Sequence, residues 1–433
     1  MKISAVKLIA VFTFTLLAFP DCSVAQQGGE ATKKEEHLRW WREARFGMFI
    51  HWGPVSLKGT EISWSRGGER RGIAGKGEIP VDVYDSLYRQ FDPVKFRADE
   101  WVSIARSAGM KYMVLTAKHC DGFCLWHSSI DAYSIANTPF KRDVCGELVG
   151  AAHKAGMRLG WYYSPMDWRD PDCRTDRNSV YVKLMQGHLR ELLSNYGRID
   201  LLWFDTDGGP APWDQAVTYS LVRSLQPQLI INNRLDMGSL EDYKAQNIGP
   251  QADYQTPEQR IGAFDNVRPW ETCMTLGTQW SWKPNDTIKS FDECVRILVQ
   301  CVAGDGNLLL NVGPMPNGEI EPRQVVVLRQ IGEWLAKYGE SVYGTRGGPF
   351  RNGEWGGSTL NGKSVYLHIL KWEGDRLKLP PLKAKIVRGI ALTGGTVRVE
   401  QTGEGTIVHM PVTEQNKVDT VVKLEMESPV SLQ

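Results

Sequence analysis

A predicted helix followed by a buried strand recurs five times between residues 97 and 313, and this repetition constrains the fold more than any other feature. In three of the copies a glycine stands where the helix should end. The strands lack apolar/polar alternation, so we expect them to be buried on both faces of a parallel sheet. The predicted helix and strand pairs are 99–107 with 112–116, 143–154 with 159–163, 180–195 with 199–204, 213–225 with 229–233, and 291–302 with 308–312.

This α/β pattern extends over about 300 residues and predicts a (β/α)8-like TIM barrel. An open, doubly wound parallel sheet is the alternative, but no glycine-rich phosphate-binding loop follows any predicted strand. The pattern is less clear between Asn233 and Phe291, where we expect irregular or long loops.

The composition changes after a last predicted helix that ends near Gly339. Short alternating segments follow, separated by turn sequences such as Asn361-Gly362 and Gly394-Gly395. This pattern predicts a small antiparallel β domain with a structural role. Its predicted strands are 364–371, 386–392, 406–410 and 420–425.

The first 25 residues have the pattern of a secretory signal peptide. Lys2 and Lys7 precede an apolar run, Leu8 to Phe19, and Ser23-Val24-Ala25 suits cleavage by signal peptidase. The run is too short for a membrane span, and no later segment qualifies as one. We therefore expect a secreted or periplasmic protein of a bacterium.

The composition argues against a nucleic-acid or membrane partner and against a fold held together by disulfides. The chain has 51 Lys and Arg against 50 Asp and Glu, a balance that argues against nucleic acid or an anionic membrane as a partner. Eight cysteines are too few for a disulfide scaffold, and the seven outside the signal peptide leave at least one thiol unpaired within a monomer. The oligomeric state is not indicated by the sequence.

Polar side chains follow five of the predicted strands, at the point where each strand ends. In a parallel barrel the carboxyl ends of the strands form one rim, and catalytic residues lie there. A lone aspartate after a strand is usually a helix cap, but five strands that bring histidines, carboxylates, an arginine and aromatic residues to one rim indicate an active site. The residues are His51, Lys118-His119-Cys120-Asp121, Tyr162-Tyr163-Ser164, Asp205 and Asn232-Asn233-Arg234.

Two carboxyl groups at this rim would suit hydrolysis of a glycosidic bond, which needs a nucleophile or base and a proton donor. Asp205 is the candidate nucleophile because a buried strand fixes its backbone and a nearby arginine could keep it ionised. Glu258 and Glu271 are the candidate acids, and their spacing alone does not distinguish them. Glu258 lies on a predicted loop that could approach a leaving group.

Six motifs are spread over the predicted barrel: RFGMFIHWGP (45–54), TAKHCDGFCLW (116–126), WYYSPMDW (161–168), LLWFDTDGG (201–209), PWETCMTLGTQWSW (269–282) and NLLLNVGPMPNGEI (307–320). Together they resemble the motifs of glycoside hydrolase family 29, the α-L-fucosidases. The resemblance implies a barrel followed by a β-sandwich, here residues 26–346 and 347–433. It also implies exo-acting hydrolysis with retention through a covalent fucosyl-enzyme, and fucosylated oligosaccharides or glycoconjugates as substrates. We expect no cofactor or metal.

The same resemblance implies roles for individual residues. Asp205 would be the nucleophile and Glu258 the acid/base, with Glu271 a competing candidate that would otherwise shape the pocket. The residues implied to bind fucose are His51, Trp64, His119, Tyr163, Arg234 and Trp280, with Cys120 beside them.

Three departures from the family pattern concern the pocket. Cys120 stands where the family often has a second histidine, and a thiol is the weaker hydrogen-bonding group. Ser63-Trp64-Ser65 replaces a common Glu-Trp-Tyr, and Trp280-Ser281-Trp282 replaces a common Trp-Gly-Tyr. These changes leave the linkage preference open.

Two other classes of protein fit the sequence less well. A metal-dependent hydrolase would use His51, His119, Cys120, Asp121 and His127, but no spaced ligand motif is present, and neighbours on a strand face opposite ways. A non-catalytic fucose-binding barrel should lack the carboxylates, whereas Asp205 and Glu258 are both present.

Overall fold

The computed structural model describes residues 22–206, 213–237 and 240–430. Its first helix is α1 (Cys22–Ala44). The described residues up to Arg39 belong to one compact unit, and Trp40 begins a second unit that contains all the elements discussed below. Residues 1–21 of the predicted signal peptide lie outside the described residues. Among the helices that are described, none is long and apolar enough to cross a membrane.

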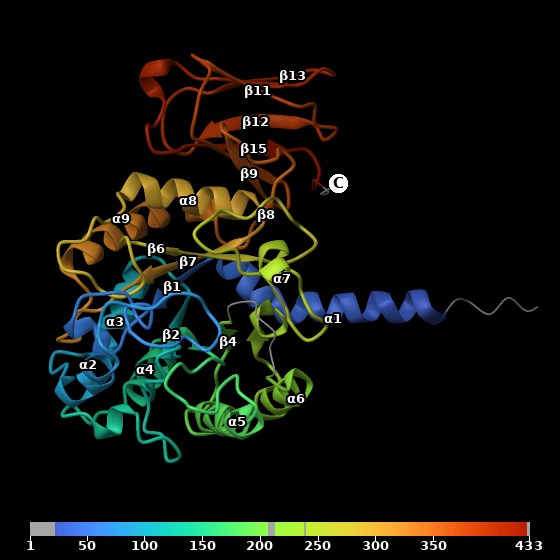
Figure 1. Cartoon of the computed structure of the whole chain (residues 1–433). Coiled ribbons are helices and arrows are strands. Elements are labelled where there is room, and N and C mark those ends of the chain that lie inside the picture. Colours follow the sequence, from blue (N-terminus) through green and yellow to red (C-terminus); the bar gives the residue numbers. More distant parts are fainter. Residues whose placement is uncertain (1–21, 207–212, 238–239, 431–433) are drawn as a thin grey trace, which may run out of the picture. The chain divides into compact units, whose positions relative to one another are not determined.

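Seven parallel strands form the central sheet of the second unit (Figure 1). Apart from the partly buried Arg158, every residue in these strands is buried, as the lack of alternation predicted. The strand order is β5-β4-β3-β2-β1-β7-β6. The bounds are β1 (Phe46–Ile50), β2 (Tyr112–Lys118), β3 (Arg158–Tyr163), β4 (Leu201–Phe204), β5 (Ile230–Ile231), β6 (Glu271–Thr275) and β7 (Asn307–Val312).

Residues 253–259 connect the two edge strands of this sheet. Single parallel bridges join Asn232, which follows β5, to Tyr254, and join Glu258 to Cys273 of β6. The Asp253 amide donates to the Ile231 carbonyl over 2.8 Å, which ties the segment to β5. Eight parallel segments therefore form the barrel. The stretch between 233 and 291 is largely irregular, as expected, but it also contains this segment, α7 (Leu240–Ala245) and β6. The segment contains Pro257, which has no amide hydrogen, so the sequence of residues 253–259 does not predict a strand.

Helices alternate with the strands, and all the predicted ones are present. Gly109, Gly156 and Gly197 have φ of 82°, 66° and 68°, the left-handed conformation expected of a glycine that ends a helix. The Ser290 hydroxyl caps α8 by accepting from the Glu293 amide. The helices are α2 (Val81–Ser86), α3 (Ala98–Ser107), α4 (Val144–Lys154), α5 (Asn178–Ser194), α6 (Gln215–Leu225), α7 (Leu240–Ala245), α8 (Phe291–Ala303) and α9 (Pro322–Tyr338).

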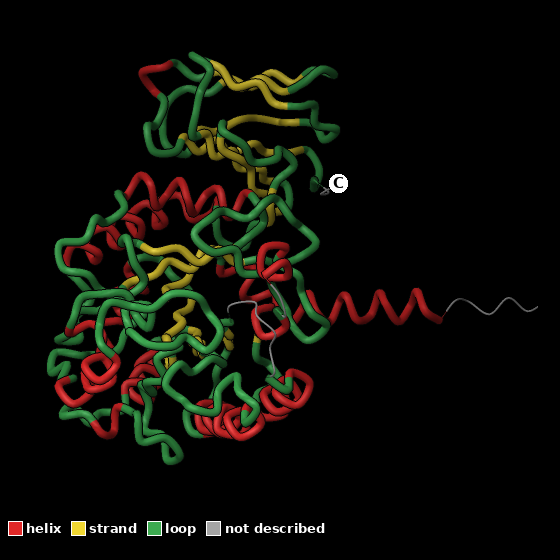
Figure 2. The backbone as a smooth tube through the Cα atoms, viewed as in Figure 1, coloured by secondary structure: helices red, strands yellow, loops and turns green. Residues whose placement is uncertain are grey.

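The C-terminal part consists of two antiparallel sheets, in the orders β12-β15-β10-β9-β8 and β11-β14-β13. Figure 2 shows it as strands and loops with one short helical turn, Val412–Glu414. The four predicted strands are confirmed as β10, β12, β14 and β15. Strands β8 and β9 contact α8 of the barrel. The boundary between residues 346 and 347 stays a prediction, because β8 spans it. The strands are β8 (Arg346–Gly347), β9 (Gly356–Asn361), β10 (Ser364–Ile369), β11 (Arg376–Leu379), β12 (Ile386–Ala391), β13 (Arg398–Gln401), β14 (Thr406–His409) and β15 (Thr420–Met426).

Candidate active site

A cavity of about 300 Å³ lies at the C-terminal ends of the barrel strands. Its lining includes residues that directly follow β1, β2 and β4, the rim where a barrel of this kind carries its chemistry. All the predicted site residues line it except Glu271 and Tyr163. The lining residues are Phe49, His51, Trp64, Ile73, His119, Cys120, Tyr162, Met166, Trp203, Asp205, Thr206, Arg234, Glu258, Cys273 and Trp280.

Arg234 binds both carboxylates of the cavity. One terminal nitrogen of its guanidinium donates to Asp205 Oδ1 over 2.6 Å, and the other donates to Glu258 Oε2 over 2.8 Å. The guanidinium is buried, is held by Thr256 through its Nε, and lies 4.5 Å above the ring centre of Trp203. A planar fork of fixed donors therefore keeps the two carboxyl groups close to each other.

Asp205 is held at both of its oxygens. Tyr162 donates its hydroxyl proton to Asp205 Oδ2 over 2.6 Å, while Arg234 occupies Oδ1. Burial raises the pKa of Asp205; the charge of Arg234 opposes this rise, the nearby Glu258 adds to it, and the Tyr162 hydrogen bond opposes it. The two donors fix the orientation of the Asp205 carboxylate. The Asp205 side chain is 22 % exposed.

Two neutral histidines form another wall of the cavity. His51 Nδ1 lies 2.6 Å from Asn311 Oδ1, so Nδ1 carries the proton and Nε2 is left as an acceptor. Burial lowers the pKa of His51 to about 3. His119 Nδ1 lies 2.6 Å from the Ser63 hydroxyl, and burial holds the pKa of His119 well below its usual range. Both rings can therefore exchange hydrogen bonds with hydroxyl groups without adding positive charge beside the carboxylates.

Two loops bring tryptophans to the cavity. Asn311 donates to the Trp280 carbonyl over 2.6 Å, and Glu61 accepts from the Trp280 amide over 2.8 Å, so both backbone polar groups of Trp280 are fixed. Trp64 is 39 % exposed and meets Trp168 edge to face. An exposed, rigidly backed indole of this kind offers an apolar face to a ligand.

Cys120 lines the cavity beside Asp205. Its Sγ lies 3.2 Å from the Ser164 hydroxyl, which itself donates to the Asp205 carbonyl. Burial raises the pKa of the Cys120 thiol well above its ordinary value. The thiol is therefore neutral, and its contact with a sugar hydroxyl would be a weak hydrogen bond.

The prediction that Tyr163 faces the substrate is contradicted by its position. Its hydroxyl lies 3.0 Å from His188 Nδ1 on α5, outside the barrel, and the preceding residue, Tyr162, points into the cavity instead. Successive residues of a strand face opposite sides. Because both faces of β3 are buried, the sequence carries no alternation to tell these sides apart.

Glu271 lies at the opposite end of the barrel from the cavity. It is the first residue of β6, is fully buried, and accepts hydrogen bonds from Tyr112 and from Trp41 Nε1. Burial raises the pKa of Glu271 to about 7. Its place at the start of a strand, among aromatic residues, removes it from the rim that Asp205 and Glu258 share.

The residues that would form a catalytic metal site do not come together. His127 is exposed and bound to the Lys141 carbonyl, and Asp121 accepts from the Tyr84 hydroxyl outside the cavity. Tyr162, which the sequence placed only among the residues at the end of a strand, and Trp203, which it did not single out, also line the cavity. They occupy inward-facing positions near the ends of β3 and β4, and only the register of the barrel identifies such positions.

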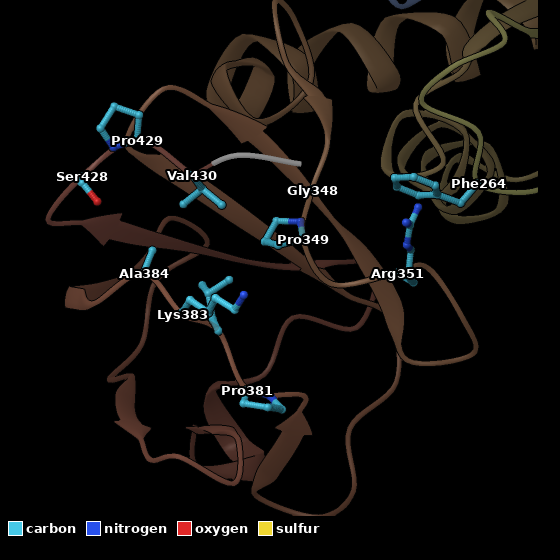
Figure 3. Close-up of a pocket in the computed structure, with 11 residues that line it drawn as sticks. Phe264, Gly348, Pro349, Arg351, Pro381, Lys383, Ala384, Ser428, Pro429 and Val430 are labelled. Carbon is cyan, nitrogen blue, oxygen red and sulfur yellow. The ribbon is translucent and has the colours of Figure 1, made fainter. Parts of the chain in front are cut away.

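A different cavity, of about 600 Å³, involves the C-terminal β domain (Figure 3). Arg351 stacks over Phe264 there, 3.6 Å from the ring centre. The lining of this cavity contains no carboxylate and no histidine, so the cavity lacks the groups that acid/base chemistry needs. The lining residues are Phe264, Gly348, Pro349, Arg351, Pro381, Leu382, Lys383, Ala384, Ser428, Pro429 and Val430.

The sequence model of the alpha-L-fucosidase family matches residues 22–340, which is most of the chain. The chain belongs to the alpha-L-fucosidase family. It is similar to the plasma alpha-L-fucosidase of Pongo abelii, with 33% identity over 365 residues that cover 77% of this chain and 76% of the relative. The human plasma alpha-L-fucosidase is 31% identical over 413 residues, covering 88% and 84%.

Solved structures of fucosidases have the same architecture. The alpha-L-fucosidase isoenzyme 1 from Paenibacillus thiaminolyticus superposes with a TM-score of 0.80 at 33% identity, covering 91% of this chain and 100% of the other. An alpha-L-fucosidase from Bacteroides thetaiotaomicron, solved as a trapped covalent intermediate with 2-fluoro-fucosyl fluoride, superposes with a TM-score of 0.78 at 27% identity, covering 91% and 96%. The (β/α)8-like barrel with a C-terminal β domain is thus a fold that fucosidases use.

Proposed function

We propose that this chain is an exo-acting, retaining α-L-fucosidase that removes terminal α-L-fucose from glycans by double displacement. The observation that carries the proposal is the pair of carboxylates, Asp205 and Glu258, held by one arginine in a cavity at the barrel rim. A cavity of about 300 Å³ is at the small end for ligand sites, which favours a single terminal sugar. Membership of the family supports the sugar and the reaction.

In the first step Asp205 attacks the anomeric carbon while Glu258 protonates the departing oxygen. Arg234 and Tyr162 keep Asp205 ionised and aimed, since both donate to its oxygens. In the second step Glu258 takes a proton from water, which releases fucose from Asp205. Carboxyl groups of retaining enzymes lie about 5 Å apart, closer than those of inverting enzymes, and a shared guanidinium supports such a short separation.

The remaining cavity residues would recognise fucose. Neutral His51 and His119 would bind ring hydroxyls, and Trp64 and Trp280 would pack against apolar faces of the sugar. Cys120 would weaken contact with one hydroxyl. The substrate class is fucosylated oligosaccharide or glycoconjugate, and the N-terminal pattern of Lys2, Lys7 and the following apolar run supports export by a bacterium to the periplasm or beyond.

The proposal is tested by following 4-nitrophenyl α-L-fucoside with proton NMR. We expect release of 4-nitrophenol together with α-L-fucose as the first-formed anomer, which later equilibrates with the β form. The β-L-fucoside of the same phenol serves as the control and should stay intact. Release of β-L-fucose first would contradict a double displacement, and no release of fucose would contradict the whole assignment.

Tyr162→Phe should lower kcat/KM on the aryl fucoside by about 10- to 100-fold, the typical worth of a hydrogen bond to a charged group. Because the lost bond stabilised ionised Asp205, the pKa of Asp205 rises further and the acid limb of the pH profile moves to higher pH. Tyr163→Phe is the matched control, which should leave that limb in place. An unmoved acid limb in Tyr162→Phe would contradict the role given to Tyr162.

A further inference from the structure

Three side chains outside the active-site cavity bring together donors that a transition metal would bind. Cys124 and Asp131 lie on the segment that follows β2, and His188 lies on α5. A sulfur, a carboxylate oxygen and an imidazole nitrogen from these residues all lie within 4.8 Å of one another, and in the described part of the chain this is the one such group. The Cys124 and His188 side chains are fully buried and that of Asp131 is 10 % exposed. The sequence had predicted no metal site.

The hydrogen bonding of His188 leaves one nitrogen free for an ion. Its Nδ1 lies 3.0 Å from the Tyr163 hydroxyl, which can accept the Nδ1 proton and fix the tautomer. Its Nε2 is buried with no hydrogen-bond partner and lies 3.6 Å from Asp131 Oδ2, beyond hydrogen-bond range. That separation is close to the distance between neighbouring ligands in a tetrahedral zinc site, where each ligand is about 2 Å from the metal. A buried, unpaired nitrogen is costly unless something occupies the space it faces.

The charges around the cluster permit a divalent cation. Burial lowers the pKa of His188 to about 3, so the imidazole is neutral, as a ligand must be. Two cations lie nearby. The Lys118 ammonium is 3.6 Å from Asp167, which balances its charge. The Arg169 guanidinium is 3.6 Å from Asp131 Oδ1, whereas His188 approaches Oδ2, so Oδ2 is the oxygen offered to a cation. Burial raises the pKa of Cys124 well above its ordinary value, so the thiol keeps its proton until a metal displaces it.

We propose that Cys124, Asp131 and His188 bind one zinc ion as a structural site, with water as the fourth ligand. The Cys124 thiol loses its proton to solvent as the zinc–sulfur bond forms, and the resulting thiolate and the Asp131 carboxylate, which also pairs with Arg169, bind the ion. The segment after β2 also carries the cavity residues His119 and Cys120, so the ion fastens that segment to α5 behind the active site. The softness of the thiolate favours zinc over magnesium or calcium.

The test uses the full-length protein, freed of metal with a chelator and titrated with Co²⁺ alone and with Zn²⁺ alone. We expect a sulfur-to-cobalt charge-transfer band that saturates at one equivalent, and a rise in the melting temperature with zinc. Both signals should disappear in Cys124→Ser and weaken in Asp131→Asn. Cys294→Ser, which alters a buried cysteine of α8 away from the cluster, is the matched control and should retain both.

Absence of the band and of any zinc-dependent stabilisation in the wild-type protein would overturn the proposal. A band that persists in Cys124→Ser but vanishes in Cys294→Ser would also overturn it. Neither readout depends on hydrolysis of a fucoside, so failure of this site is distinguishable from failure of the proposed function.

Discussion

Asp205→Ala should lower kcat/KM on 4-nitrophenyl α-L-fucoside by about four orders of magnitude or more, the usual scale for loss of a catalytic nucleophile. Without the carboxylate no fucosyl-enzyme forms, and Glu258 alone cannot replace it. Asp205 lies at the end of a four-residue strand held in parallel pairing by β3 and β5, so its removal leaves the scaffold intact. Circular dichroism and the melting temperature should therefore match the wild type.

Azide gives this experiment a stereochemical readout. In Asp205→Ala the anion enters where the carboxylate stood, so we expect β-L-fucosyl azide, the inverted product. Asp99→Ala, which removes an exposed carboxylate of α3, is the control and should hydrolyse the substrate at the wild-type rate. Activity of Asp205→Ala above about a hundredth of wild type would contradict the nucleophile assignment.

The loss of activity in Glu258→Ala should depend on the leaving group of the substrate. Natural fucosylated glycans need protonation of the departing oxygen, and we expect their hydrolysis to fall by about 10²- to 10⁴-fold. A nitrophenolate leaves without help, so its release should fall much less in the first step. Azide should speed turnover and give α-L-fucosyl azide, because it attacks the fucosyl-enzyme from the face that water normally uses.

Glu271→Gln is the matched control for this prediction. The amide oxygen of glutamine can still accept from Tyr112 and Trp41 in the barrel core. We expect the ratio of rates on aryl fucoside and glycan to be unchanged, whatever the effect on stability. If Glu271→Gln shows the leaving-group dependence and Glu258→Ala does not, the assignment of Glu258 is wrong.

The repeated helices and strands of the barrel could be predicted from the sequence, because helices and buried strands differ in length and in the spacing of their apolar residues. Strand β2 begins with the continuous apolar run Tyr112–Leu115, and Gly109 before it ends a helix by its positive φ. The eighth barrel segment has no such pattern. It pairs through isolated bridges, contains Pro257 and carries polar residues, so its role depends on neighbours distant in the sequence.

The candidate site was predictable as a set of strand-end residues, but not in its contacts. The rim position of Asp205 and His119 follows from the rule for parallel barrels. Whether Tyr162 or Tyr163 lines the cavity depends on which face of β3 points inward. Glu271 lies far from the rim because it is the first residue of β6, not the last. The sequence alone does not show which side chains of a buried strand point into the barrel. It also does not show at which end of the strand a given residue lies.

The loosely paired segment 253–259 has an evolutionary consequence. The proposed nucleophile Asp205 directly follows β4, which pairs continuously with β3, whereas the proposed proton donor Glu258 lies on segment 253–259, which isolated bridges join to its neighbours. Mutations that lengthen or shorten this segment can relocate the donor while the attacking group stays in place. We therefore expect the position of the proposed donor to tolerate more change in evolution than the position of the proposed nucleophile.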